Sequence, residues 1–189
     1  MLEIHDIDRA QAWALVERYV QSDSLRKHML AVETCMRAYA HARGEDAERW
    51  GVTGLLHDFD WEIHPTQAEH PELGCQMLEQ LGWPADVVRA IRGHATYLNV
   101  PRDTLMARAL FACDELAGLI TAVAYVRPTK SIREVTTSSV KKKLKDKGFA
   151  RNVDRADIVA AAGEFGVDLD EHIGFMIVAM TANAEALGL

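Results

Sequence analysis

Hydrophobic residues recur every three or four positions along most of the chain, which is the spacing of a helix with one buried side. The pattern is clearest over residues 22–43, where Ser22 or Asp23 can cap a helix and Gly44 can end it. The apolar side of this helix comprises Leu25, Met29, Val32, Met36 and Tyr39. No run alternates β-branched with polar residues, and no Asn-Gly or Asp-Gly turn is present. The pattern therefore predicts an all-α chain of about eight helices.

Proline, glycine and helix-capping residues mark the ends of the other predicted helices. These helices span about 7–20, 46–57, 71–82, 84–94, 103–125, 138–147, 154–165 and a last stretch from 168. Pro71 suits the first turn of its helix. The predicted caps are Asp103, Ser138, Asp154, and Asp168 in a capping box with Glu171. In the first helix, the expected buried side consists of Ala10, Trp13, Ala14 and Val16.

The chain has 189 residues, of which 49% are hydrophobic and 26% are charged, as is ordinary for one globular domain. We therefore expect a single domain over residues 1–189. No apolar run reaches the roughly 20 residues that a membrane span needs, and the first residues lack the pattern of a signal peptide. Cys35, Cys75 and Cys113 lie at apolar helical positions, which indicates buried thiols of a cytoplasmic protein.

Charge is distributed unevenly around the net value of −7. Residues 127–155 hold ten basic and three acidic residues, while the remainder holds 11 basic and 25 acidic residues. The acidic remainder argues against a long nucleic acid as a partner. Within the basic stretch, the candidates for binding an anionic substrate are Arg127, Lys130, Lys142 and Lys143. The more common alternative is that these charges only form a solvated surface.

Histidine and aspartate residues form the most informative pattern. His57 and Asp58 are adjacent at the end of a predicted helix, while His28 and Asp114 lie on the apolar sides of two other helices. Imidazole and carboxylate groups together suit Zn, Mn, Fe, Co and Ni. A single histidine at such a position is more often a hydrogen-bonded core residue, whereas an unpaired carboxylate there would be costly to bury. Another such pair, His5-Asp6, has no supporting context.

Taken together, His28, His57, Asp58 and Asp114 follow the order His … His-Asp … Asp. In this order the chain resembles the HD superfamily of metal-dependent phosphohydrolases. The resemblance implies an HD core over about 22–126 and a C-terminal helical part over about 127–189. The segments 112–120 and 126–130 are similar to those of small bacterial HD proteins. Two further motifs, His70-x-x-x-Gly74-x-x-Met77-Leu78 and Ala90-x-x-x-His94, resemble the extra histidines of HD-GYP and HDIG-type proteins.

The chain also departs from these relatives. Phe59-Asp60 follows His57-Asp58 where HDIG-type proteins have Ile-Gly, and Trp61 stands where HD-GYP proteins carry a lysine. No Gly-Tyr-Pro follows His94. The resemblance therefore does not extend to the cyclic-dinucleotide phosphodiesterase activity of HD-GYP proteins.

The resemblance implies a phosphohydrolase that acts on a nucleotide or another small phosphate ester. One ion would be held by the four-residue motif. With His70 and His94 added, the set could hold two ions, with Asp58 as the bridge and a metal-activated water as the nucleophile. Asp60 or Glu62 could transfer protons, although a solvated loop is an equal alternative for both. A non-catalytic module that binds a metal or ligand is the competing function, and the oligomeric state is left open.

Overall fold

The computed structural model describes residues 8–189, and it confirms the all-α prediction, since this part of the chain contains no strand. Along the chain, the first helices of this part are α1 (Arg9–Tyr19), α2 (Asp23–Arg43), α3 (Ala47–Leu56), α4 (Glu72–Gln80) and α5 (Ala85–His94). They are followed by η1 (Thr96–Leu98), α6 (Leu105–Tyr125), η2 (Ile132–Glu134), α7 (Thr137–Leu144), α8 (Arg155–Phe165), α9 (Leu169–Ala182) and α10 (Ala184–Leu187). The short α10 and the two 3-10 helices were not predicted.

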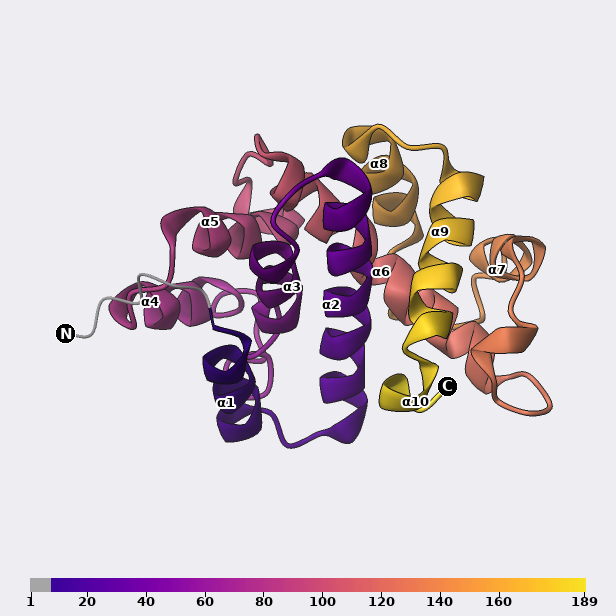
Figure 1. Cartoon of the computed structure of the whole chain (residues 1–189), viewed down its shortest axis with the longest axis horizontal. Helices are drawn as coiled ribbons and strands as arrows, with labels where there is room; N and C mark the ends of the chain where they lie inside the picture. The colour runs from indigo at the N-terminus through magenta and orange to yellow at the C-terminus, as the bar shows by residue number, and fades with distance from the viewer. Residues whose placement is uncertain (1–7) are drawn as a thin grey trace.

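Helix α2 stands at the centre of the molecule (Figure 1). It packs along α3 on one side and against α6 and α9 on the other sides. Helix α1 packs on α3, α4 packs on α5, and α5 packs on α6. Helix α8 covers α6, and α7 lies against α6 and α9 at the opposite end from α4 (Figure 1). The five helices α2 to α6 therefore surround one region, in which the candidate metal ligands lie.

Helix ends follow local side-chain chemistry, and several predicted caps are confirmed. The Ser22 hydroxyl accepts a hydrogen bond from the Leu25 N–H, and Gly44 ends α2 in the left-handed region at φ 71°. Asp154 and Asp168 cap α8 and α9. No reciprocal bond from a Glu171 side chain appears among the bonds of residues 8–189. The capping box predicted at α9 is therefore reduced to the Asp168 cap.

Three predicted helix starts were wrong. Thr104, not Asp103, caps α6, because the Asp103 carboxylate is bound to the Arg89 guanidinium. Thr136 caps α7 in place of Ser138 and forms a reciprocal capping box with Ser139. Pro71 directly precedes α4 and does not lie in its first turn.

The buried side of α1 was predicted only in part. Ala12 and Val16 are buried, whereas Ala10 and Ala14 are exposed and Trp13 is half-buried. Alanine is compatible with either side of a helix, so it gave little information about which side packs on α3. The start predicted at residue 7 and the His5-Asp6 pair lie outside the described residues.

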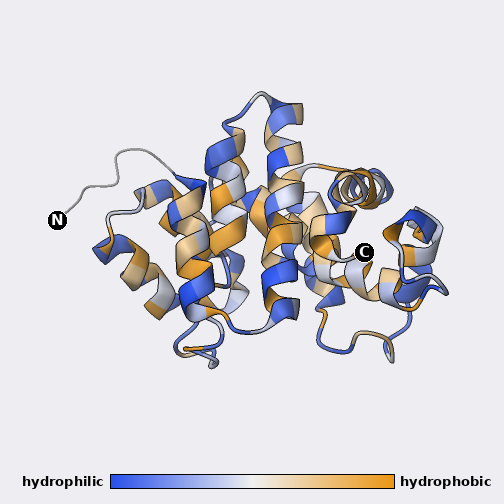
Figure 2. Ribbon diagram, turned by 60° about the horizontal axis from the view of Figure 1, so that its bottom comes forward, coloured by the Kyte–Doolittle hydropathy of each residue, from blue (hydrophilic) through white to orange (hydrophobic). Residues whose placement is uncertain are grey.

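The hydrophobic core extends from α2 and α6 into the C-terminal helices. Phe165, Ile173 and Met176 belong to the same buried cluster as residues of α2 and α6. Fully burying a side chain of this size contributes on the order of 1.5–3 kcal/mol. Hydrophobic and hydrophilic bands alternate along the outer helices, as expected for helices with one buried side (Figure 2). The three cysteines are buried thiols, and burial raises the pKa of Cys75 to about 12.

No helix within residues 8–189 has both the length and the apolar character needed to span a membrane.

Candidate metal centre

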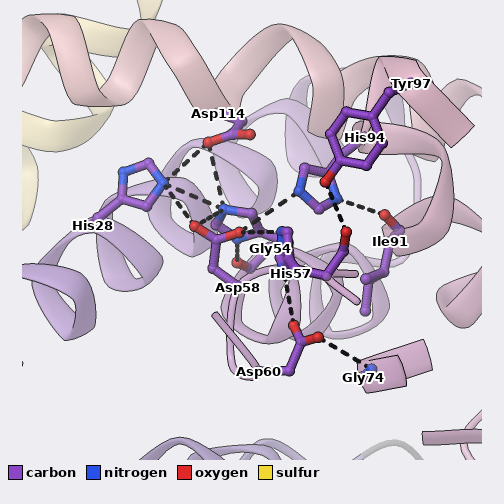
Figure 3. Close-up of polar contacts among 11 residues, drawn as sticks. His28, Gly54, His57, Asp58, Asp60, Gly74, Ile91, His94, Tyr97 and Asp114 are labelled. Atoms are coloured by element: carbon purple, nitrogen blue, oxygen red, sulfur yellow. Dashed lines mark hydrogen bonds and ion pairs between the residues drawn. The ribbon is translucent and has the colours of Figure 1, made fainter. Parts of the chain in front are cut away.

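Six side chains from α2, α5, α6 and the segments that follow α3 and precede α4 converge on one region. Figure 3 shows five of them, His28, His57, Asp58, His94 and Asp114. The six side chains form two groups, and within each group the potential donor atoms lie within 4.8 Å of one another. The first group consists of His28, His57 and Asp114. The second group consists of Asp58, His70 and His94. The structure thus brings together all six residues that the sequence motifs singled out as ligands.

The helix boundaries explain how these side chains meet. His28 and Asp114 lie within α2 and α6, which pack directly against each other. His57 is the C-cap of α3, so it and Asp58 extend from the end of that helix into the space between α2 and α6. His94 is the last residue of α5, and the next residue has an extended backbone. Ligands at helix ends and on packed helix sides therefore point into one volume.

Distances within the first group match those between ligands of a shared ion. His28 Nε2 lies 3.0 Å from Asp114 Oδ1 and 3.3 Å from His57 Nε2. His57 Nε2 is 3.4 Å from the same Asp114 oxygen. Two donors bound to one ion at about 2.1 Å with near-tetrahedral angles stand roughly 3.4 Å apart. The three donor atoms therefore fit a divalent ion.

Asp58 connects the two groups through its two carboxylate oxygens. Its Oδ1 lies 3.4 Å from His70 Nε2 and 3.6 Å from His94 Nε2. Its Oδ2 lies 3.4 Å from His57 Nε2 and 3.8 Å from His28 Nε2. One oxygen therefore faces each group, which is the arrangement that a carboxylate bridging two ions requires.

Hydrogen bonds behind the centre fix three of the imidazole rings. His57 Nδ1 lies 2.8 Å from the Gly54 carbonyl oxygen, and His94 Nδ1 lies 2.5 Å from that of Ile91. His70 Nδ1 lies 2.9 Å from an oxygen of Asp60. With the Nδ1 proton donated to these oxygens, each Nε2 is left with its lone pair toward the centre. Metal-ligating histidines in proteins are generally held in this way.

Asp60 and Glu62, the two carboxylates expected to transfer protons, belong to neither donor group. Asp60 is buried behind His70, and its second oxygen accepts a hydrogen bond from the Gly74 N–H. A Cβ atom at Gly74 would overlap this carboxylate, so glycine is required there. The solvated-loop alternative was therefore wrong for Asp60. Both oxygens of Glu62 accept hydrogen bonds from the backbone N–H groups of Gln21 and Ser22, next to the start of α2.

A cavity of about 400 Å³ opens beside the two groups, within the usual range of roughly 300–1,000 Å³ for small-molecule sites. His28, Asp58, His70, His94 and Asp114 line its floor. Its walls include Trp61, Gln67, Tyr97, Phe111, Glu115, Asn152 and Asp157. Glu115 could have been suspected from its place beside Asp114, but no sequence motif marks Tyr97, Asn152 or Asp157. These residues join the site only through the packing of η1 and α8 near α6.

The four basic residues expected to bind substrate do not line this cavity. Lys142 lines a separate hollow beside α7 and α9. Lys143 pairs with Asp146 and lies over the Phe149 ring. Lys130 is exposed and Arg127 half-buried in the segment that follows α6. These four residues therefore do not line the cavity, although Asn152 of the same stretch lines it and Arg151 lines a neighbouring hollow.

Charges in the centre strongly shift the pKa values of its members. Burial lowers the pKa of His57, but the Asp58 and Asp114 carboxylates raise it by more, so it lies well above its ordinary value. Burial likewise raises the pKa of Asp58, but His57 and His94 outweigh this effect and hold it well below the usual range. Burial and the nearby Asp114 raise the pKa of Glu115 to about 7. Without metal, the raised pKa values of His57 and His94 therefore favour the protonated form of these two rings.

Added Mn²⁺ is expected to raise the melting temperature more at high pH than at low pH. In metal-free protein, the raised pKa values of His57 and His94 contribute stability fully below the unfolded histidine value of about 6.5. That contribution is lost as the pH rises through the folded values. The lowered pKa values of Asp58 and Asp114 contribute stability above about 3.9, which is lost only as the pH falls through the folded values.

Metal binding displaces the protons from His57 and His94. At high pH, where these histidines have lost their positive charge, the metal ions supply positive charge beside Asp58 and Asp114. The measurement is the difference in melting temperature between Mn²⁺-loaded and chelator-treated protein from pH 6 to pH 9. A difference that stays flat or shrinks with rising pH would contradict the ligand assignment.

The structure is an all-α fold around a partly buried cluster of histidine and aspartate side chains that could hold metal ions. The sequence matches the HD domain family over residues 25–119, so the chain belongs to that family. The match begins within α2, ends within α6 and includes all six clustered residues. HD domains are characteristic of a superfamily of metal-dependent phosphohydrolases. No curated protein and no solved structure matches the chain.

Proposed function

We propose that this chain is a phosphohydrolase that uses two divalent transition-metal ions to hydrolyse a nucleotide or another small phosphate ester. The observation that carries the proposal is the position of Asp58, with one oxygen toward each group of donors. Fe, Mn, Co, Ni and Zn all suit this combination of imidazole and carboxylate donors. Bound ions would polarise a phosphoryl oxygen and lower the pKa of a bound water toward neutrality.

The chain's own residues would position these ions and the substrate. His28, His57 and Asp114 would hold one ion, His70 and His94 the other, and Asp58 both. The backbone oxygens of Gly54 and Ile91 and the carboxylate of Asp60 would keep three of the imidazoles in the ligating orientation. We assign Asp60 to positioning His70 and not to proton transfer.

Asp60→Asn is expected to weaken binding at the second group by roughly 10–100-fold, the usual cost of losing such an outer partner. The amide introduced by this change can keep only one of the two bonds, because its NH₂ group cannot accept from either His70 or Gly74. Titration of metal-free protein with Mn²⁺ measures the effect. The matched control is Asp103→Asn, which changes an exposed carboxylate paired with Arg89 and should leave both affinities unchanged. Equal affinities in the two variants would contradict the positioning role.

A non-catalytic module that binds a metal or ligand is the second candidate function. The open cavity beside the centre favours the enzyme, because structural metal sites are usually closed by protein ligands, whereas catalytic sites keep open positions. The test is phosphate release from p-nitrophenyl phosphate by metal-free protein supplied with Mn²⁺, Co²⁺, Ni²⁺, Fe²⁺ or Mg²⁺. Turnover that requires an added ion would support the enzyme. Tight metal binding without turnover of this ester or of a nucleotide panel would favour the non-catalytic module.

A further inference from the structure

Two partly exposed aromatic rings form one wall of the cavity. Trp61 is 43% exposed and Tyr97 is 38% exposed, although both are large hydrophobic side chains. Each is anchored to the same ligand. The Trp61 ring lies 4.8 Å from the His70 ring at 88°, and the Tyr97 hydroxyl donates a hydrogen bond to the His70 carbonyl oxygen at 2.7 Å. The rings are therefore fixed beside the second group while part of their surface remains available to a ligand.

The rest of the cavity wall is formed by polar and acidic side chains together with Ala95, Phe111 and Gly118. Within residues 8–189, neither a lysine nor an arginine lines it. Its polar groups outside the two donor groups include the side chains of Gln67, Asn152, Glu115 and Asp157. Proteins usually bind phosphate groups through arginine, lysine or helix N-termini. A phosphate in this cavity would therefore have no lysine or arginine partner and would depend on bound metal ions for neutralisation, and a further phosphate would face carboxylates.

From these two walls we infer that the substrate is a phosphate monoester with a single phosphate and an uncharged part that carries a planar aromatic ring, such as a nucleoside 5′-monophosphate. The inference rests on the proposed function. The phosphate would lie at the metal centre, and the base would stack against Trp61, the more exposed of the two rings. The sugar hydroxyls donate hydrogen bonds to Asp157 or to the Asn152 side-chain oxygen. Stacking of a base on an aromatic side chain tolerates any base, so the ring type matters more than the base identity.

A neighbouring hollow along α6 could accommodate a longer ester with a second phosphate, which is the alternative to a monophosphate substrate. It shares Gly118 and Asn152 with the cavity and is also lined by Arg151. A longer ester that follows α6 would bring a second phosphate toward Arg151. Preference for a diphosphate over a monophosphate would therefore contradict the inference and point to this route.

The first test compares kcat/KM for AMP, ribose 5-phosphate and ADP with excess Mn²⁺. AMP and ribose 5-phosphate differ only in the base, so AMP is expected to be favoured by on the order of 10- to 100-fold, the range that base stacking supplies. AMP is also expected to be favoured over ADP. In Trp61→Ala the ratio of AMP to ribose 5-phosphate should fall toward one, whereas Trp61→Phe should retain most of it because phenylalanine keeps a ring. A wild-type ratio near one would overturn the inference.

A second measurement does not depend on turnover. Saturation-transfer NMR with adenosine and metal-free protein is expected to show transfer to the protons of the adenine ring in wild type and to lose it in Trp61→Ala. Ribose alone should show none. If no ester is hydrolysed but adenosine contacts Trp61, the proposed function is wrong, while the inferred binding of an aromatic base by Trp61 is supported. If esters are hydrolysed without preference and adenosine shows no transfer, only the inference fails.

Discussion

Asp58→Ala is expected to remove both ions from the protein and to abolish phosphate release while the chain stays folded. Each Asp58 oxygen lies within 3.4 Å of an imidazole nitrogen in a different group. Alanine leaves the second group with two neutral imidazoles and leaves the first with a single carboxylate. The loss should exceed the roughly 10–100-fold that removal of an outer partner costs.

The fold should survive this change because Asp58 follows the end of α3 and is not part of the hydrophobic core, although the loss of its pairing with His57 and His94 should lower the stability of metal-free protein. Far-ultraviolet circular dichroism and metal analysis of parallel preparations measure the two effects. Asp103→Ala is the matched control, since its exposed carboxylate pairs with Arg89 away from the centre. An Asp58→Ala protein that keeps the wild-type metal content would rule out the bridging assignment.

His70→Ala and His94→Ala are each expected to remove one ion and most of the activity. Both side chains face Asp58 Oδ1, at 3.4 Å and 3.6 Å, and both belong to the second group. The first group keeps its three donors in either variant, so one equivalent of metal should remain. The measurement is metal content together with phosphate release, for wild type and both variants purified in parallel.

His172→Ala provides a control of the same residue type. His172 is also buried, but its ring is hydrogen-bonded to the Tyr39 hydroxyl and the Ala112 carbonyl oxygen, outside both groups. This variant should melt at a lower temperature, because two buried hydrogen bonds are lost, and should keep both ions. If His70→Ala and His94→Ala behave like His172→Ala, with reduced stability and unchanged metal content, both residues are structural and the two-ion proposal is wrong.

Local chemistry allowed much of the fold to be predicted from the sequence. The ends of α2 at Ser22 and Gly44 depend on groups within a few residues, and both were predicted. The cap of α6 was not, because Arg89, which is distant in sequence, binds Asp103 and leaves Thr104 as the cap. The side of α1 that packs on α3 likewise depends on a tertiary contact that its alanines did not indicate.

In the candidate site, too, the features set by local sequence could be predicted and those set by tertiary packing could not. The six clustered residues lie in recognisable motifs at helix ends or on apolar helix sides, so their convergence could be anticipated. The cavity walls could not, because Tyr97 and Asp157 belong to no motif and reach the cavity only through packing. The basic stretch could not be placed from the sequence either. Its charge is a local property, but which of its residues reach the cavity is set by the course of the chain after α6.

The most direct test of the central claim is an anaerobic titration of metal-free protein with Mn²⁺ that follows bound metal and phosphate release from p-nitrophenyl phosphate and a nucleotide panel in the same samples. A two-ion phosphohydrolase predicts saturation at two equivalents, with release that rises as the second ion binds and disappears when a chelator is added. Saturation at one equivalent, or two bound equivalents without any phosphate release, would contradict it.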